Sequence, residues 1–242
     1  MPRLYCPIPL VSGHLLELPA SAARHAQVLR MQPGEAVTLF NGQGGEFDAV
    51  IERMGRSDVQ VTIGSHDPAE REGLRPVHLV VGMPANERMD WLVEKAAELG
   101  VASIQPLLAQ RSVLRLQGER ARKKQAHWQG VAIAACEQSG RNRIPAVLPI
   151  MALAQWTATL DPAVAHGQAR LLLSLAPSAL PLRLAAGNDG EVVLLSGPEG
   201  GLTAQEEEMA TALGFQRATL GPRVLRSETA PLAALAALTL AG

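Results

Sequence analysis

The sequence predicts an α/β protein, with a small β-rich module followed by a mostly parallel sheet covered by helices. Three observations predict this. From Val77 onward, apolar strand-like runs alternate with helix-like segments, which is typical of parallel strands joined by crossover helices. Residues 1–72 are instead rich in strands and turns. Residues 66–76 between them are polar, contain two prolines and are interpreted as a linker. We therefore expect domains at 1–72 and 73–242.

The N-terminal module is expected to be compact and barrel-like. Residues 37–40 and 46–51 are strand-like, and the Asn-Gly turn between them adopts the positive φ angles of a hairpin easily. Residues 58–63 alternate with period two, as a half-buried strand does. A short helix is expected over residues 21–31, with Ser21 as a suitable N-cap.

The larger, C-terminal part alternates strands and helices along its length. Most of its strand-like runs are apolar throughout, which is typical of strands covered on both faces. The strands are expected at 77–81, 104–108, 144–150, 171–173 and 192–195. The helices are expected at 86–99 with Asn86 as the N-cap, at 118–137, at 151–160 and at 232–240.

Two glycine-rich stretches follow strand-like runs near the C-terminus. Residues 197–201 are Gly-Pro-Glu-Gly-Gly, and residues 220–230 begin with Leu-Gly-Pro-Arg. Backbone without side chains lets a ligand approach closely at a strand end. A capping box at Thr203 and Glu206 predicts a helix start directly after the first stretch.

The glycine spacing fits neither a P-loop nor a dinucleotide fingerprint. The acidic residues 206–208 also make this helix start a poor phosphate site. Two interpretations remain. The stretches form a backbone-lined pocket for an adenosine-type ligand without phosphates, with Leu195, Leu220 and Leu225 around the adenine, or they are structural turns.

Composition restricts the function further. The chain is 47% hydrophobic and 3% aromatic, so it can bury a large core but is unlike proteins that bind RNA mainly by base stacking. No signal peptide or membrane-spanning run is visible, and we expect a cytoplasmic location. Cys6 and Cys136 lack metal-site spacing, so we expect reduced thiols and no metal.

Charge is concentrated in one segment, although the net charge is only −1. Residues 111–143 hold eight Lys or Arg and two Glu, whereas residues 1–72 hold six basic and nine acidic residues. A localised basic segment indicates a phosphate-bearing partner or a solvated helix face. Arg24 and Arg30 in the module leave the same two interpretations open.

Several segments, in order along nearly the whole chain, resemble the SPOUT-class ribosomal RNA small subunit methyltransferase E family. The two glycine-rich stretches carry most of the resemblance. Segment 94–101 is similar to the family's K-x-x-E-L-G-V, and 110–113 to its E/Q-R-S loop. Segment 134–145 is similar to its A-x-E-Q-S-x-R-x-x-x-P pattern, and 24–30 contains its V-L-R motif.

The resemblance implies methyl transfer from S-adenosylmethionine to N3 of a uridine in 16S rRNA of the 30S subunit (uridine 1498 in the usual small-subunit numbering). It also implies a deep trefoil knot at about 190–230, a PUA-like N-terminal barrel and a homodimer. The sequence departs from the family at Ser174-Leu175-Ala176-Pro177, where a His/Glu-Pro type is expected. Two alternatives stay open: a SPOUT enzyme acting on tRNA or large-subunit rRNA, and a non-catalytic RNA-binding module.

Carried over residue by residue, the resemblance implies a set of cofactor contacts and a set of RNA contacts. The expected cofactor contacts are Leu175, Leu195, Gly197, Gly200, Gly201, Leu220, Gly221, Val224 and Leu225. The expected RNA contacts are Arg3, Arg24, Arg30, Arg111, Gln138, Arg141 and Arg143. Gln138 is interpreted either as a reader of a base edge or as a loop brace.

Three side chains in the glycine-rich stretches are candidates for catalysis: Arg226, Glu199 and Glu228. The N3 proton of uridine must be removed, or the anion stabilised as it forms. Arg226 is interpreted as a donor to a uracil carbonyl or the target phosphate, or as an ion-pair partner of Glu199 or Glu228. The proton acceptor is either of these carboxylates or solvent.

Overall fold

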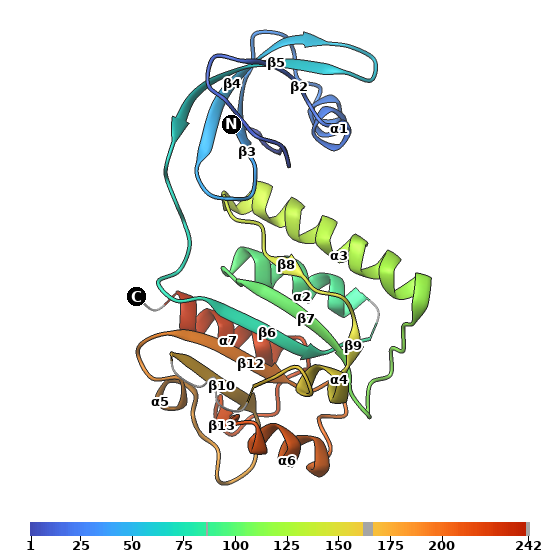
Figure 1. Ribbon diagram of the computed structural model, residues 1–242, viewed down its shortest axis with the longest axis vertical. Helices are drawn as coiled ribbons and strands as arrows, with labels where there is room; N and C mark the ends of the chain where they lie inside the picture. Colours follow the sequence, from blue (N-terminus) through green and yellow to red (C-terminus); the bar gives the residue numbers. More distant parts are fainter. Residues whose placement is uncertain (86, 162–166, 241–242) are drawn as a thin grey trace. The chain divides into compact units, whose positions relative to one another are not determined.

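The computed structural model describes residues 1–85, 87–161 and 167–240, which form two compact units (Figure 1). The first unit contains Met1–Glu72 and Ile133–Ile144, and the second contains Gly73–Ala132 and the residues from Pro145 onward. Residues 133–144 therefore group with the N-terminal module, which their position in the sequence did not indicate. Asn86, the expected helix cap, lies outside the described residues.

The first unit is a five-stranded sheet with one helix. The strand order is β1-β3-β4-β5-β2, in which β1 runs parallel to β3 and the other pairs are antiparallel. Its elements are β1 (Arg3–Tyr5), β2 (Leu15–Glu17), α1 (Ala20–Val28), β3 (Ala36–Phe40), β4 (Glu46–Met54) and β5 (Val59–Asp67). Alternate residues of β5 point into a core shared with the alanines of α1, which confirms the period-two prediction.

Two details of α1 differ from the expectation. The helix begins at Ala20 with Pro19 as its N-cap, and no side chain caps it, so the assignment of Ser21 as the N-cap was wrong. Proline fixes a φ angle suited to this position, and its missing N–H leaves one fewer unpaired donor at the helix start. The helix ends two residues before Arg30, whose φ of 57° is incompatible with continuing it.

The second unit is built on an eight-stranded sheet in which every recorded pair is parallel. The strand order is β11-β13-β10-β12-β6-β7-β8, and β9 pairs with β7. The strands are β6 (Val77–Gly82), β7 (Ser103–Leu108), β8 (Ala146–Val147), β9 (Met151–Ala152), β10 (Gln168–Leu173), β11 (Leu180–Pro181), β12 (Glu191–Ser196) and β13 (Gln216–Thr219). The helices are α2 (Glu87–Glu98), α3 (Gly118–Ser139), α4 (Leu153–Thr157), α5 (Leu182–Ala186), α6 (Ala204–Ala212) and α7 (Thr229–Thr239), and the residues of α3 from Ile133 onward belong to the first unit.

Helices cover both faces of this sheet, as the apolar strands predict. Helices α4 and α6 pack on one face through a core that includes Trp156, Phe215 and Leu195. Helix α7 packs against β6, β12 and α2 on the other (Figure 1). Only two residues of the expected strand 144–150 are paired, as β8, and the expected helix at 151–160 is a short strand, β9, followed by α4.

The order of the central strands positions the candidate site. Strands β13, β10 and β12 are neighbours and run parallel, so their carboxyl ends meet at one edge of the sheet. Both glycine-rich stretches begin at this edge, one directly after β12 and the other directly after β13. The expected trefoil knot stays a prediction. Among the residues described, no helix is long and apolar enough to span a bilayer.

Candidate cofactor-binding site

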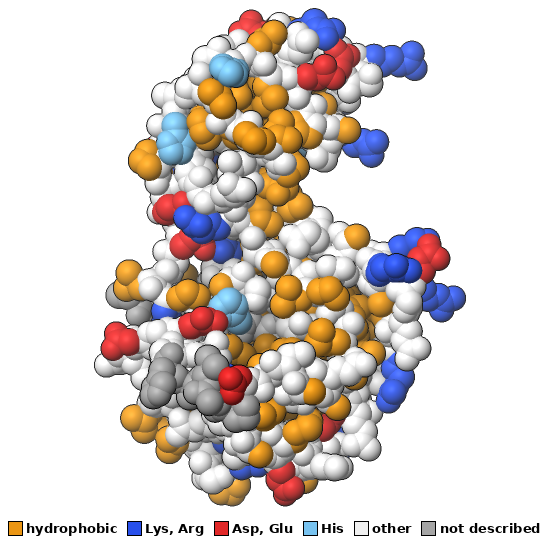
Figure 2. Space-filling model, in the orientation of Figure 1, with side chains coloured by type: hydrophobic (Ala, Val, Ile, Leu, Met, Phe, Trp, Pro, Cys, Tyr) orange, Lys and Arg blue, Asp and Glu red, His pale blue; other side chains and the backbone are white. Residues whose placement is uncertain are grey.

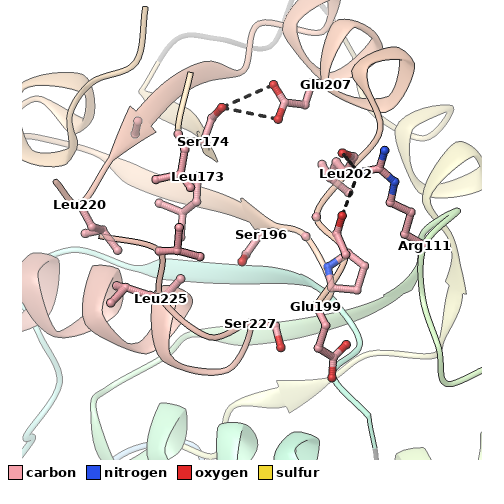
Figure 3. Close-up of a pocket in the computed structure, with 18 of the residues that line it drawn as sticks. Arg111, Leu173, Ser174, Ser196, Glu199, Leu202, Glu207, Leu220, Leu225 and Ser227 are labelled. Carbon is pink, nitrogen blue, oxygen red and sulfur yellow. Dashed lines mark hydrogen bonds between the residues drawn. The ribbon is translucent and has the colours of Figure 1, made fainter. Parts of the chain in front are cut away.

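A cavity of about 370 Å³ lies at this edge of the second unit (Figure 3). Both glycine-rich stretches line it, together with the residues that follow β10. Its lining residues are Arg111, Leu173–Leu175, Ser196–Leu202, Glu207, Ala218, Leu220, Gly221, Arg223–Leu225, Ser227 and Ala230. The volume lies within the range of pockets that hold small-molecule ligands, about 300–1,000 Å³.

The first glycine loop, residues 197–202, is folded so tightly that Gly197 has no room for a side chain. Gly201 has a φ of 67°, and its N–H donates to the carbonyl of Pro198 at 2.8 Å. A Cβ atom at Gly197 would lie 2.8 Å from the backbone nitrogen of Leu202. A Cβ at Gly82, at the end of β6, would lie 2.6 Å from the nitrogen of Pro198. The conformation of the loop thus requires glycine at position 197 within the loop and at position 82 in the adjacent strand β6.

The capping box predicted at the start of α6 is confirmed. The Thr203 hydroxyl accepts from the N–H of Glu206, and the Glu206 carboxylate accepts from the N–H of Thr203 at 2.8 Å. Glu206 also accepts from the N–H of Gln110 at 2.8 Å. The Glu206 carboxylate therefore places a negative charge at the start of the helix, which disfavours a phosphate there.

The second glycine loop, residues 220–228, forms the opposite wall. Gly221 has a φ of 107°, and its N–H donates to the Thr219 hydroxyl at 3.1 Å. Leu220 and Leu225 point toward the cavity from this loop (Figure 3). Val224 lines the cavity but is 80% exposed, so it lies at the open side.

Arg88 contacts an acidic residue from each of the two loops. Its guanidinium lies 3.4 Å from Glu199 in the first loop and 3.8 Å from Glu228 in the second. Glu199 also accepts from the N–H of Ala85 at 2.8 Å, and Glu228 accepts from the Ser227 hydroxyl at 3.2 Å. An arginine near the start of α2 therefore connects the two walls of the cavity, a role that the sequence alone gave no reason to assign to it.

Arg226 does not make the ion pairs that one interpretation of the sequence gave it. Its side chain is exposed, and Arg88 occupies the position next to both carboxylates. Its backbone carbonyl accepts from the N–H groups of Thr229 and Ala230, at the beginning of α7. No ion pair joins the Arg226 guanidinium to another residue that the structure describes, and Arg226 is not part of the cavity lining, although Leu225 and Ser227 on either side of it are.

Most of the residues expected to contact the cofactor line the cavity. Eight of the nine do so: Leu175, Gly197, Gly200, Gly201, Leu220, Gly221, Val224 and Leu225. Leu195 does not, because it points into the core beneath α6 and is fully buried. In a strand, successive side chains point to opposite faces, and an apolar run does not indicate which of them reaches the strand end.

Arg111 was expected to contact RNA and instead forms part of the cavity wall. Its side chain packs on Gly200 and donates to the carbonyl of that residue at 2.9 Å. It therefore holds the first glycine loop in place. The charge of Arg111 suggested a function, but the sequence did not indicate its partner, Gly200, because the two residues lie 89 positions apart.

Sequence reasoning missed the polar part of the lining, which includes Ser174, Ser196, Glu207 and Ser227 (Figure 3). Ser174 follows β10 directly and Ser196 ends β12, so both stand where a parallel strand meets the ligand edge. Their position at strand ends was the sequence signal that could have identified the two serines as lining residues. Glu207 comes from the first turn of α6, and its carboxylate accepts from Nε of Arg217 at 2.9 Å.

The remaining expected RNA contacts lie in the first unit and divide into two groups. Arg24, Arg30, Gln138 and Arg143 are exposed. Arg141 is 4% exposed, and its guanidinium donates two hydrogen bonds to Glu72, so this placement corrects its assignment as a surface contact.

Arg3 is also held by protein groups. It donates to Glu46 at 2.6 Å and to the side-chain oxygen of Asn142 at 2.5 Å. Arg71 donates to the same Glu46 carboxylate at 2.8 Å, which lowers the pKa of Glu46 from its usual range to about 2. Together these contacts attach residues 140–143 to the sheet of the first unit.

Both cysteines belong to the first unit and lie in its interior. Cys6 and Cys136 are buried free thiols, and burial raises the pKa of Cys6 to about 12 and that of Cys136 to about 11. Within the described ranges, no group of three or more His, Cys, Asp or Glu side chains is arranged to hold a metal ion.

Comparison with known proteins identifies related families and structures. A family of RNA methyltransferase domains matches residues 71–239, and a family of RNA methyltransferase PUA domains matches residues 18–64. The ribosomal RNA small subunit methyltransferase E of Bacillus subtilis is 31% identical over 217 residues, which cover 88% of this chain and 84% of that protein. The enzyme of the same name from Mycobacterium tuberculosis is 32% identical over 216 residues, 88% and 81% of the two chains.

Two solved structures are similar over almost their whole length. Ribosomal RNA small subunit methyltransferase E from Neisseria gonorrhoeae, bound to S-adenosyl methionine, has a TM-score of 0.89 at 38% identity and covers 98% of this chain and 96% of that one. A putative methyltransferase from Legionella pneumophila, with bound S-adenosylmethionine, has a TM-score of 0.89 at 39% identity, covering 99% and 97%.

Proposed function

We propose a specific reaction for this chain, which belongs to the SPOUT-class ribosomal RNA small subunit methyltransferase E family. It transfers the methyl group of S-adenosylmethionine to N3 of a uridine in the 16S rRNA of the 30S subunit. The observation that carries the proposal is the cavity enclosed by the two glycine loops. Its lining of backbone groups and apolar side chains suits an adenosine ligand that carries no phosphate.

The residues around the cavity fit this cofactor. Leu173, Leu220 and Leu225 supply apolar surface for the adenine, and glycine backbone at 197 and 200–201 allows close approach. Two similar proteins, from Neisseria gonorrhoeae and Legionella pneumophila, have S-adenosylmethionine bound. Both facts support a cofactor site formed by these loops.

S-adenosylmethionine supplies a methyl group that the sulfonium already activates, so the protein must position the uridine and manage the N3 proton. The pKa of this proton lies well above 7, and negative charge develops on the uracil carbonyl oxygens as it is lost. In our proposal the exposed Arg226 guanidinium donates to one of these oxygens. A preorganised cation at such a position stabilises the forming anion.

The contacts of the two carboxylates favour Glu199 over Glu228 as a candidate acceptor of the N3 proton. Glu228 is 8% exposed and is not part of the cavity lining, so it braces the second loop. Glu199 lines the cavity and retains 26% of its side-chain exposure. In this proposal Glu199 or solvent accepts the proton, and Glu228 holds the loop through Arg88.

In this proposal RNA is bound through exposed groups of the first unit. Arg24, Arg30 and Arg143 neutralise phosphates, and the side-chain amide of Gln138 contacts a base edge. Each phosphate contact contributes a slope of about 0.7–0.9 to the dependence of log affinity on log salt.

The proposal includes a cytoplasmic homodimer, which light scattering after gel filtration of the purified chain will measure as twice the 25.6 kDa chain mass.

The test is mass-spectrometric mapping of 3-methyluridine in small-subunit rRNA. RNA from a strain without this gene should lack one 3-methyluridine, and purified chain with S-adenosylmethionine should restore it. Free 16S rRNA and assembled 30S subunits serve as separate substrates. Methylation of another nucleotide would identify a different SPOUT enzyme, and failure to bind S-adenosylmethionine would indicate a non-catalytic RNA-binding module.

A further inference from the structure

We infer that Glu207 and Ser174 form a subsite for the two ribose hydroxyls of the cofactor, an inference that rests on the proposed binding of S-adenosylmethionine. Both residues line the cavity, although they come from different elements: Glu207 from the first turn of α6 and Ser174 from the end of β10. Figure 3 shows the Glu207 carboxylate turned toward the Ser174 hydroxyl, and each carboxylate oxygen lies 3.5 Å from Ser174 Oγ.

The charge of Glu207 is balanced within the protein. Arg217 in β13 donates from Nε to the carboxylate at 2.9 Å, and the two side chains are only 24% and 26% exposed. A neighbouring arginine opposes the approach of a further cation, such as the ammonium group of the methionine part. The carboxylate still has lone pairs for uncharged hydrogen-bond donors, since one carboxylate offers about four acceptor sites.

The position of the pair within the cavity favours ribose over adenine. Ser174 follows Leu173 directly, and Leu173, Leu220 and Leu225 are among the apolar residues of the lining (Figure 3). A ribose is bonded directly to its adenine, so the first polar groups beside an apolar adenine slot lie within reach of the sugar. The ribose 2′ and 3′ hydroxyls are donors, and an acidic side chain binds a ribose hydroxyl in dinucleotide folds for the same reason.

The ribose subsite can be tested by calorimetry with S-adenosylhomocysteine and its 2′-deoxy and 3′-deoxy counterparts as probes. The unaltered chain should bind the ribose form roughly tenfold more tightly than at least one deoxy form, because a hydrogen bond to a charged acceptor is lost. Glu207→Gln should reduce this preference severalfold. Glu208→Gln, at the exposed neighbouring position of α6, is the matched control and should keep the full preference.

Each outcome bears on the inference. Equal binding of the ribose and deoxy forms by the unaltered chain would overturn it while leaving the cofactor site intact, whereas no binding of any form would reject the proposed function as well. A Glu207→Gln variant that keeps the full preference would also overturn it. If that variant does not fold, Ser174→Ala serves in its place: a reduced preference supports the subsite, and an unchanged preference overturns it.

Discussion

At the scale of single residues, Arg88 makes the ion pairs that one interpretation of the sequence gave to Arg226. Arg88 contacts Glu199 and Glu228, whereas the side chain of Arg226 is exposed next to the same loop. A cation already engaged by two carboxylates is poorly placed to stabilise a new negative charge, because its field is partly neutralised. Our proposal therefore assigns the substrate contact to the exposed guanidinium of Arg226.

Replacing Arg226 with alanine is expected to lower kcat on 16S rRNA by about 10²–10³-fold, the usual effect of removing one donor to a developing anion. The affinity for S-adenosylmethionine should stay unchanged, because Arg226 is not part of the cavity lining. Single-turnover kinetics and calorimetry measure the two quantities. Arg183→Ala, which removes another exposed arginine of the same unit, is the control. Near-normal turnover of Arg226→Ala would contradict the role.

At the scale of elements, the cavity depends on loops held from outside by β6, by Arg111 and by α2. Gly82 at the end of β6 touches the first loop, Arg111 packs on Gly200, and Arg88 connects the first loop to the second. Loops alone would be mobile, since they form few backbone hydrogen bonds of their own. Contacts from ordered elements keep the two walls of the cavity at a fixed separation.

Gly82→Ala should weaken cofactor binding by about 1–3 kcal/mol, because the new methyl group would push the backbone of residues 197–198 out of place. Gly130→Ala in α3 is the matched control. Its Cβ would meet nothing within 4 Å, and alanine in a helix stabilises by about 0.5–1 kcal/mol relative to glycine. Calorimetry with S-adenosylhomocysteine measures the affinity, and equal affinities of the two variants would count against the loop argument.

Arg88→Ala is expected to weaken cofactor binding modestly, by about 1 kcal/mol or less, because the arginine side chain is 43% exposed and its ion pairs are screened by solvent. The effect should vanish when Glu199 and Glu228 are both replaced by glutamine. A double-mutant cycle on the dissociation constant measures this coupling. Full additivity would show that Arg88 acts independently of the two carboxylates.

At the scale of the whole molecule, ion pairs join segments far apart in the sequence within each unit. In the first unit Glu46 accepts from Arg3 and Arg71, and Arg141 donates to Glu72. The Arg141–Glu72 pair and the hydrogen bond from Arg3 in β1 to Asn142 attach residues 133–144 to the N-terminal part of the unit, although about 60 residues of the second unit separate the two parts in the chain. The first unit therefore combines two parts of the chain that lie far apart in the sequence.

The first unit should lose stability in acid through Glu46. The hydrogen bond from Arg71 and the contacts of Arg3 lower the pKa of Glu46 from 4.5 to about 2 in the folded state. A lowered folded pKa stabilises the fold above the unfolded value, and this stabilisation is lost as the pH falls from 4.5 to about 2. The side chain keeps 15% of its exposure, so we expect at most about 3 kcal/mol.

Urea unfolding between pH 7 and pH 2, followed by amide NMR signals of β1 and β4, measures this contribution. Glu46→Gln should be less stable than the unaltered chain at pH 7, and the difference should disappear toward pH 2. Glu17→Gln, at an exposed position of β2, is the control and should follow the unaltered chain. A constant difference between Glu46→Gln and the unaltered chain across this range would rule out the carboxylate charge as its cause.

The sequence by itself determined the local features of this protein. Apolar runs placed most of the larger strands, because a strand covered on both faces must be apolar throughout. The glycine loops and the capping box at Thr203 were also predictable, since each depends on residues only a few positions apart. Eight of the nine cofactor contacts that the family resemblance implies line the cavity.

Only the tertiary structure decided which side chains meet across long sequence separations. Arg88 contacts a residue 111 positions away, Arg111 one 89 positions away, and Arg141 one 69 positions away. An arginine in a basic segment has the same sequence signature whether it faces solvent or a buried carboxylate, because charge alone does not specify a partner. The order of β13, β10 and β12 brings Glu207, Ser174 and Arg217 together, and strand order is a property of the whole sheet.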